Sequence, residues 1–376
     1  MEMGKVEWSD LHEDLIDLIA DRVSGNIDIV RMSSICKPWR STVANKERFP
    51  YRFNRNLPNF KKKKTDLSPT AFFRVTLPSS SCPNKGWLIK TKQFSESSKI
   101  NLMSPFFNAD NTTTKQTLDL LKVGVSEIRQ AYNVEYVRVK DDRGYDFFAN
   151  SVRAVLVHNM IFKVEWNKEI WCCKIVEESE KKEEEKKGKI EWRRIESKEA
   201  ELFSDIIVQK GQIYALDLKG AIWWISLSEL KIFQYRPSTP VIQDYFHMGD
   251  YCKDKRLVEY CGDLCVVLRL CKIFREWRGD KERTVGFTVY KMDKNLVEWV
   301  EVSSLGDKAI IMCMESCLVV SASEYYGCLE NAIYFTDDDG RDKRKCEDIV
   351  KVFKLEGGII DSSSQSFLEM FTPPFL

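Results

Sequence analysis

Apolar residues follow two different spacings along this chain of 376 residues. Near the start they recur every three to four positions, which is typical of an amphipathic helix. That stripe consists of Leu11, Leu15, Leu18 or Ile19, and Val23, and Ile16 widens it. Asp10 and Glu13 resemble a capping box at its start, and Ser24-Gly25-Asn26 is a stop signal. The spacing therefore predicts a first helix between Asp10 and Ser24.

Two more short helices are predicted before residue 50. The second begins near Asp28, and the third has Pro38 in its first turn, where proline is tolerated. Their apolar residues are Ile29, Met32, Ile35, Cys36, Trp39 and Val43. Three helices in roughly 40 residues form a unit that is marginal alone. Because its apolar residues outnumber what its own core needs, we expect an exposed apolar patch, which normally marks a contact site.

From about Ala71 onward, strand-like runs replace the helical stripe. The runs are rich in Val, Ile, Tyr, Phe and Trp and are separated by Gly, Asp and Asn turns. Strands are predicted within residues 86–93, 99–105, 154–166, 169–177, 189–196, 206–227, 256–274, 284–302, 316–327, 331–340 and 348–358. Residues 117–131 hint at a helix, although Val123-Gly124-Val125 argues against it.

A loose repeat runs through these strands. Residues 211–220, 286–302 and 331–340 share an aromatic strand next to a Gly or Asp turn. Recurrence at roughly 40 to 50 residues is typical of four-stranded propeller blades, and the available length would make about six or seven of them. The predicted fold is therefore a small all-α unit followed by a large all-β domain, a β-propeller. A large β-sandwich is the alternative.

Charge and composition narrow the function classes. The chain has 58 Lys plus Arg against 57 Asp plus Glu, which argues against a nucleic-acid or membrane-surface binder. An apolar run of about 18 residues, as a membrane span needs, is absent. The first residues lack the apolar core of a signal peptide, so the 12 cysteines are expected as free thiols in a reducing compartment.

The sequence shows no motif for metal binding or catalysis. The cysteines form no CxxC pair, and the three histidines, His12, His158 and His247, are scattered. Gly-x-Ser-x-Gly, P-loop and Gly-x-Gly-x-x-Gly patterns are absent. Asp337-Asp338-Asp339-Gly340 lacks the spacing of a calcium loop and is interpreted as an acidic turn. We therefore expect no catalytic residues, no metal and no cofactor.

Two polar segments separate or interrupt the folded parts. Residues 51–70 are basic and broken by Pro58 and Pro69, which predicts a linker. Its four lysines at 61–64 are a weak match to a nuclear localisation patch, and a solvated linker is favoured. Residues 177–189 mix both signs of charge between two strand-like runs and predict a solvated hairpin loop.

The N-terminal stretches WSDLHEDLIDLIADRV (8–23) and DIVRMSSICKPWRSTV (28–43) resemble an F-box. The matching residues are Leu11, Leu15, Ile16, Ile19 and Val23 in the first helix, Arg31, Ile35 and Cys36 in the second, and Trp39 and Arg40 in the third. One departure is His12, where the family usually has proline, and Asp10 is expected to cap the helix instead. An ordinary helical extension docked on its own domain is the alternative.

The resemblance implies binding to a Skp-type adaptor and, through it, to a cullin within a ubiquitin ligase. The residues that it implies at this contact are Leu11, Leu15, Ile16, Ile19, Val23, Ile35, Cys36 and Trp39. They are apolar and aromatic, as the anchors that carry most of an interface's energy tend to be.

The C-terminal region resembles the domain of unknown function found in many plant F-box proteins of the Kelch-like group. The matching stretches include KGWLIKT (85–91), LVEYCGDLCVV (257–267) and SCLVVSASEYYGCLENAIYFTDD (316–338). The resemblance implies capture of a target protein by this domain, without saying which target or which residues bind it.

Together these observations predict an F-box over residues 1–50, a linker over 51–70 and a substrate-recognition domain over 71–376. The expected function is that of a non-catalytic subunit that brings a target to a Skp–cullin–F-box ubiquitin ligase in the nucleus or cytoplasm. Two alternatives remain open. One is a propeller enzyme or sugar-binding module with an incidental helical leader, and the other is an F-box protein acting outside a ligase.

Overall fold

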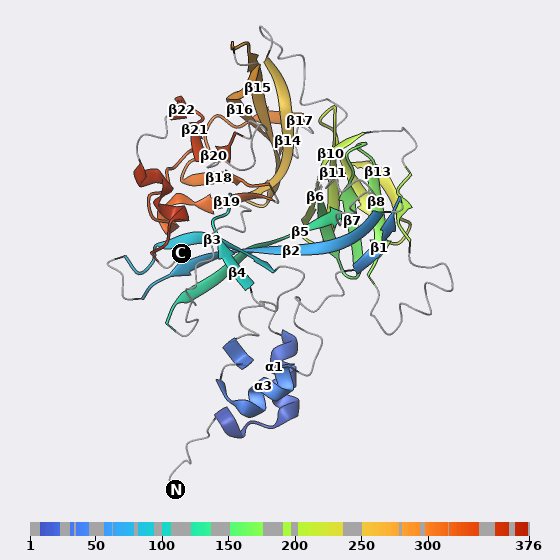
Figure 1. Ribbon diagram of the computed structural model, residues 1–376, viewed down its shortest axis with the longest axis vertical. Helices are drawn as coiled ribbons and strands as arrows, with labels where there is room; N and C mark the ends of the chain where they lie inside the picture. Colours follow the sequence, from blue (N-terminus) through green and yellow to red (C-terminus); the bar gives the residue numbers. More distant parts are fainter. Residues whose placement is uncertain are drawn as a thin grey trace.

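A computed structural model shows a small helical unit beside a large β-domain (Figure 1). The residues that it describes are 8–22, 31–33, 35–44, 56–61, 63–78, 82–93, 100–106, 122–136, 151–175, 191–196, 202–235, 250–277, 280–293, 298–314, 316–337, 350–360 and 365–374. The charged segment 177–189, predicted as a hairpin loop, lies outside these residues.

The helical unit consists of short helices, as the apolar spacing predicted. Its elements are η1 (Trp8–Asp10), α1 (Glu13–Arg22), a helical turn at residues 31–33 and α3 (Lys37–Ala44). The start of α1 differs from the prediction, because Asp10 lies in η1 and not at the cap. His12 precedes the helix instead: its carbonyl accepts the N–H of Ile16 at 3.1 Å, and its Nδ1 accepts the N–H of Asp14 at 3.4 Å.

The described strands of the β-domain form four sheets. The first contains β1 (Asn56–Phe60), β2 (Lys63–Thr76), β3 (Gly86–Gln93), β4 (Ile100–Met103), β5 (Gly124–Tyr136), β6 (Ser151–Val157), β7 (Met160–Val164), β8 (Ile170–Lys174) and β9 (Arg193–Arg194). The second contains β10 (Phe203–Gln209), β11 (Gln212–Asp217), β12 (Ile222–Ser226) and β13 (Lys231–Tyr235).

The third and fourth sheets complete the domain. The third contains β14 (Asp250–Tyr260), β15 (Asp263–Phe274), β16 (Lys281–Asp293) and β17 (Glu298–Glu301). The fourth contains β18 (Lys308–Met312), β19 (Cys317–Ser321), β20 (Ala332–Thr336), β21 (Val350–Lys354) and β22 (Gly358–Ile360), followed by η4 (Gln365–Phe371). The short η3 (Ala322–Glu324) follows β19. Most strands pair antiparallel in hairpin order, although β18 and β20 are parallel.

The four sheets are set around a common centre (Figure 1). Strand β6 contacts β10, β10 contacts β14, and β14 contacts β19, so one strand from each sheet faces the middle of the domain. In the described residues the strands make four sheets, fewer than the six or seven blades that the repeat spacing suggested. This radial arrangement places loops and strand ends from every sheet close to one central axis.

The linker predicted over residues 51–70 is wrong from residue 56 onward, because β1 and most of β2 lie there. Pro69 does not break β2, because at that point the strand has a partner on one side only. Strand β1 pairs with β2 as far as Asp66, and β3 begins pairing at Thr70. Pro58 lies in β1, at the edge of the sheet, where a missing N–H leaves no partner unsatisfied.

The weak helix signal over residues 117–131 is also overturned. Residues 124–131 belong to β5, which pairs with β2 along its length, and residues 107–121 lie outside the described part of the chain. The predicted strands over residues 86–93, 206–227 and 256–274 are confirmed. Pairing with β2 therefore overrides the weak local preference for a helix in this segment.

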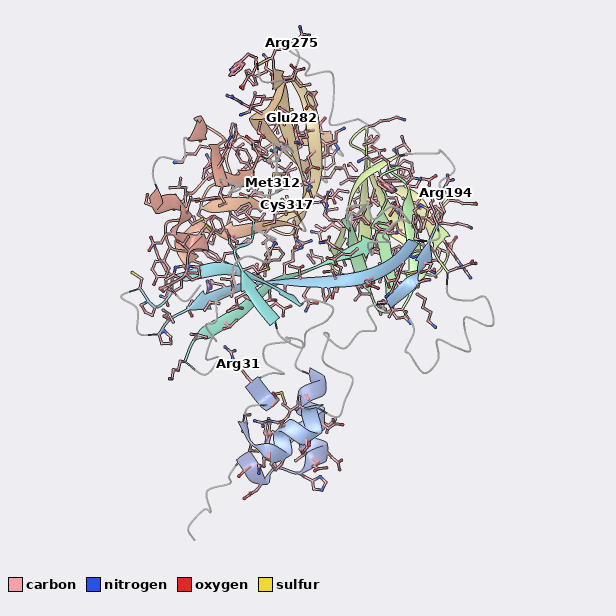
Figure 2. All side chains as sticks on the ribbon, viewed as in Figure 1. Arg31, Arg194, Arg275, Glu282, Met312 and Cys317 are labelled. Atoms are coloured by element: carbon pink, nitrogen blue, oxygen red, sulfur yellow. The ribbon has the colours of Figure 1, made fainter. Side chains whose placement is uncertain are left out.

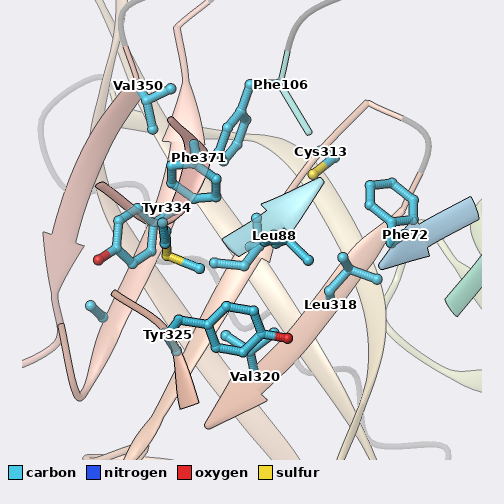
Figure 3. Packing of buried hydrophobic residues seen from close by; sticks show 14 of the residues in the cluster. Phe72, Leu88, Phe106, Cys313, Leu318, Val320, Tyr325, Tyr334, Val350 and Phe371 are labelled. Atoms are coloured by element: carbon cyan, nitrogen blue, oxygen red, sulfur yellow. The ribbon is translucent and has the colours of Figure 1, made fainter. Parts of the chain in front are cut away.

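The last residues of the chain pack against the first sheet. Phe371 of η4 lies edge-on to Phe106, with ring centroids 5.0 Å apart, and to Tyr334, with centroids 5.4 Å apart. Figure 3 shows these rings in one cluster with Leu88 of β3. The backbone N–H of Tyr326 donates to the carbonyl of Gly86 at 3.2 Å. The fourth sheet and the chain's end are thereby fixed to the first sheet.

Candidate functional site

The helical unit has a core of its own. Its buried members are Ile16, Ala20, Met32, Trp39 and Val43, and Leu11 and Cys36 pack against them. Ile16 and Ala20 are one turn apart on α1, so one face of that helix points into the unit. Arg40 Nε donates to the carbonyl of Ser33 at 3.1 Å and joins α3 to the preceding turn. The unit therefore does not depend on the β-domain for its apolar packing.

The opposite face of α1 is apolar and exposed. Leu15, Leu18 and Ile19 are 49%, 54% and 36% exposed and lie at spacings that place them on one side of the helix. We call these three residues the outer face. Ile35, from the segment before α3, is also 52% exposed. Large aliphatic side chains gathered in this way on a small unit mark a contact surface.

These positions divide the eight residues predicted to bind an adaptor. Leu15, Ile19 and Ile35 are exposed, whereas Leu11 and Cys36 are partly buried and Val23 lies outside the described residues. Ile16 and Trp39 are 0% and 4% exposed, so the expectation that they touch a partner is corrected: they hold the unit together. Leu18, which was not in the predicted set, is the most exposed apolar side chain of α1.

The helical unit lies beside the first sheet. Arg31 projects from it toward the β-domain (Figure 2), and its Nη2 lies 3.5 Å from the carbonyl oxygen of Val123, just before β5. This is a long and weak hydrogen bond. The outer face of α1 is therefore not covered by the β-sheets.

A second candidate site lies at the centre of the β-domain, where charged side chains converge from different sheets. Its members are Arg129 of β5, Arg153 of β6, Asp205 of β10, and Asp254 and Arg256 of β14, with Cys317 of β19 beside them. We call these residues the central cluster. The label of Cys317 in Figure 2 shows where the central cluster lies, between the sheets.

Three members of the central cluster directly follow a β-bulge. The extra residue in each bulge is Ile128 before Arg129, Ser204 before Asp205 and Lys253 before Asp254. A bulge turns the side chain that follows it and interrupts regular pairing, and bulges are common next to functional sites. Three of them on three strands direct charged groups toward one point.

The charges of the central cluster form two pairs and leave one cation over. Arg153 Nη1 lies 2.7 Å from Asp205 Oδ1, and Arg256 Nε lies 2.6 Å from Asp254 Oδ2. The second oxygen of Asp205 accepts the N–H of Leu257 at 2.8 Å and so joins β10 to β14. Among the described residues, no acceptor binds the half-buried guanidinium of Arg129. Nη1 of Arg256, which is enclosed, also has no acceptor there.

Burial and mutual attraction act in opposite directions on the pKa values here. Burial would raise the pKa of Asp254, but Arg256 and Arg153 outweigh it and hold that pKa below its ordinary value. Burial lowers the pKa of Arg153, whereas Asp254 and Asp205 keep the pKa of Arg256 raised. Burial raises the pKa of the Cys317 thiol to about 12. Cys317 is therefore a neutral thiol at physiological pH and not a nucleophile.

Two spaces share Arg129 in their lining. A cavity of about 40 Å³ inside the domain is lined by Arg129, Arg153 and Asp205. A groove of about 570 Å³ runs outward between β5, the β14–β15 turn and β19, and Arg129 and Glu259 line it. A volume of that order matches the size range of ligand sites, and the inner cavity has room for a water-sized group. Arg129 therefore borders both the groove and the cavity.

The chemistry of the remaining candidates is structural. No group of three or more His, Cys, Asp or Glu side chains with metal-binding geometry occurs in the described ranges. Asp337 accepts Arg269 Nη2 at 2.6 Å and Lys351 Nζ at 2.7 Å, so it ties the third sheet to the fourth. Residues 338–340 of the acidic turn lie outside the described chain. No helix among the described residues is long and apolar enough to cross a membrane.

A buried lysine is enclosed by aromatic rings in the first sheet. Lys163 is fully buried, and its Nζ lies 2.9 Å from Glu165 Oε1 and 2.8 Å from the hydroxyl of Tyr136. The same Nζ lies 3.7 Å from the ring centroid of Phe60 and 4.1 Å from that of Trp192. Burial lowers the pKa of Lys163 to about 8, although Glu165 opposes this shift. The cluster locks β1 and β5 onto β7.

This lysine makes stability depend on pH. Between pH 7 and 9 the folded protein releases the Lys163 proton, while the unfolded chain keeps it up to a pKa of about 10.4. Because the unfolded state then binds more protons, the free energy of unfolding rises with pH by about 1 kcal/mol from this group. We expect the difference in free energy of unfolding between wild type and the Lys163→Met/Glu165→Leu variant to shift by that amount in favour of wild type. Urea titrations at pH 7, 8 and 9 measure this difference, and a difference that does not change with pH would contradict the assignment.

Comparison with known proteins places the fold in a family. A family model described as "KIB1-4 beta-propeller" matches residues 57–354, which begin in β1 and end with β21. The match identifies the β-domain as a propeller and not a sandwich. It leaves the narrower Kelch-like assignment a prediction, and the helical unit lies before the matched residues.

Two relatives extend the likeness over nearly the whole chain. F-box protein At2g26160 of Arabidopsis thaliana is 51% identical over 341 residues, which cover 89% of this chain and 97% of that protein. F-box protein At4g35733 of the same plant is 47% identical over 379 residues, with 98% of each chain covered. The chain therefore belongs to the plant F-box proteins that carry a KIB1-4 β-propeller.

Proposed function

We propose that this protein is a non-catalytic substrate-recognition subunit of a Skp–cullin–F-box ubiquitin ligase, acting in the nucleus or the cytoplasm. The outer face of α1 binds a Skp-type adaptor, and the β-domain holds a target protein. The observation that carries the proposal is the exposed apolar face of a helical unit that already has a complete core. The names of the relatives, which are F-box proteins, support the same assignment.

The physical role of such a subunit is proximity. A target bound to the β-domain and an adaptor bound to α1 are held on one chain, so the target's effective concentration beside the ligase rises without any chemistry in this protein. Bond formation belongs to other subunits. The helices lie apart from the sheets of the β-domain (Figure 1), so an adaptor on α1 and a target on the β-domain would not compete for the same surface.

Adaptor binding is tested by changing the outer face without touching the core. The Leu15→Asp/Ile19→Asp variant places two charges where apolar side chains would be buried, and we expect adaptor affinity to fall by at least about 100-fold. The measurement is capture of purified Skp-type adaptor by the full-length protein, titrated to obtain Kd.

The matched control makes the same kind of change on the β-domain. Leu218 and Val300 are 37% and 43% exposed, so Leu218→Asp/Val300→Asp alters two comparable apolar side chains far from α1 in the sequence. We expect this variant to bind the adaptor as wild type does. Equal binding by the outer-face variant and wild type would refute the proposed contact.

A role inside a ligase is a further step and needs its own measurement. A cullin should co-purify with the full-length protein through the adaptor and should be lost with the Leu15→Asp/Ile19→Asp variant. Adaptor binding without any cullin would instead support an F-box protein that acts outside a ligase.

A further inference from the structure

The central cluster is built more precisely than packing alone requires. Charged residues are normally kept out of protein interiors unless they are paired. Here three strands each carry a bulge directly before a charged residue that faces the centre. Two ion pairs are complete, and one guanidinium, that of Arg129, has no protein acceptor in the described residues. The guanidinium of Arg129 is therefore available to a ligand in the groove that it lines.

We propose that Arg129 receives the carboxylate of an acidic side chain from a target protein segment lying in the groove. The inference rests on the proposed function, because it names the chemistry by which the β-domain recognises its target. An Arg–carboxylate pair is a charge-assisted and often bidentate contact. The cavity of about 40 Å³ beyond Arg129 has room for such a small group.

The carboxylates near Arg129 are already engaged in ion pairs, so the charge of Arg129 is left for a ligand to pair with. Asp205 is already shared between Arg153 and the N–H of Leu257, and Asp254 is bound to Arg256. Neither carboxylate is free to turn toward Arg129 without breaking those contacts. A carboxylate from outside therefore gains a full charge-assisted interaction.

The other charges of the groove favour a single carboxylate over a polyanion. Two further charged residues that line the groove are already paired, Lys308 with Asp307 at 3.1 Å and Glu324 with Arg74, whereas Glu259 adds a carboxylate to the same lining. A nucleic acid or a run of acidic residues would meet the carboxylate of Glu259 as well as Arg129, and like charges repel. One acidic residue within an otherwise neutral segment fits the charge pattern best.

The test uses two peptide libraries and the full-length protein. In one library each 12-residue peptide has Asp or Glu at its centre and random neutral residues around it. In the other, Asn or Gln replaces the central acid. We expect wild type to retain the acidic library about tenfold better than the amide library, as a charge-assisted contact predicts.

Three variants make the result specific. Arg129→Gln should lose the preference, and Arg129→Lys should keep part of it because the charge remains. Arg275→Gln is the matched control, because Arg275 is exposed at the far end of the β-domain (Figure 2) and should behave as wild type. Thermal unfolding of each variant checks that it is folded.

The outcome separates this inference from the proposed function. Equal retention of both libraries by wild type, including no retention of either, overturns the inference, as does an unchanged preference in Arg129→Gln. Peptide binding needs no adaptor. A peptide preference in a protein that fails to bind the adaptor would therefore refute the proposed function and leave the acidic-residue site standing.

Discussion

The Trp39→Ala variant is expected to unfold the helical unit and leave the β-domain intact. Trp39 is 4% exposed at the centre of the unit's core, against Ile16 and Val43. Removing a buried tryptophan side chain costs about 3–5 kcal/mol. A unit this small holds no more than about 3–5 kcal/mol of stability from its core, so the loss is enough to unfold it.

Hydrogen exchange of the full-length protein measures this result region by region. Backbone amides of α1 and α3 should lose protection in Trp39→Ala, while those of β15 and β16 should exchange as in wild type. Leu18→Ala is the matched control, because Leu18 is exposed and its truncation leaves the core untouched. Protected α1 amides in Trp39→Ala would show that the core assignment is wrong.

The same experiment distinguishes residues that contact the adaptor from residues that keep the helical unit folded. Trp39→Ala should also lose adaptor binding, but through unfolding, whereas Leu15→Asp/Ile19→Asp should lose binding with α1 still protected. Loss of binding in both variants alone would not tell the two roles apart, so exchange and capture need to be measured on the same preparations.

The Asp205→Asn variant is expected to destabilise the β-domain by about 3–5 kcal/mol, because breaking one half of a buried ion pair leaves the other charge uncompensated. Asp205 is 4% exposed and holds Arg153 of β6 and the N–H of Leu257 of β14. It therefore joins strands of three sheets at the centre of the domain. Urea unfolding followed by tryptophan fluorescence should show a lower midpoint with an unchanged slope.

Two further variants test the reason for that loss. Asp307→Asn makes the same chemical change at a side chain that is 58% exposed, and its midpoint should stay near that of wild type. Arg153→Met/Asp205→Leu removes both charges and should recover part of the stability, because no unpaired charge remains. A double variant less stable than Asp205→Asn would contradict the explanation.

The first helix shows both the reach and the limit of sequence reasoning. The spacing of Leu15, Ile16 and Ile19 correctly predicted a helix with an apolar surplus. It did not say which residues face inward, because apolar residues occupy both sides of α1 and periodicity alone gives no direction. The position of α3 settles it: Trp39 packs on the side of Ile16, which leaves Leu15 outside.

The wrong prediction of a linker over residues 51–70 also arises because local signals do not show how the chain pairs. Proline and lysine in residues 51–70 are loop signals when read locally. The buried positions Leu57, Phe60 and Leu67 carry the opposite signal, but their alternation is interrupted by the β1–β2 turn and is recognisable only once the pairing is known. Pro69 is tolerated because neighbouring strands end and begin around it, which is a property of the sheet and not of the sequence.

The central cluster was not predicted at all. Arg129, Arg153, Asp205 and Asp254 come from separate strands, and in the sequence each looks like an ordinary charged residue of an alternating strand. Their convergence depends on bulges at Ile128, Ser204 and Lys253, for which the sequence carries no recognisable mark. The only usable hint is a charge at a position where a buried residue is expected.

The packing of η4 against β3 has a consequence for how the protein is made. The helical unit depends on local contacts and can form as soon as its residues leave the ribosome. The packing of Leu88 and Phe106 cannot be completed until Phe371 is synthesised, and Phe371 comes long after both of them in the chain. Until then the nascent chain carries a folded helical unit followed by an incomplete propeller, whose exposed apolar surfaces favour misfolding and aggregation.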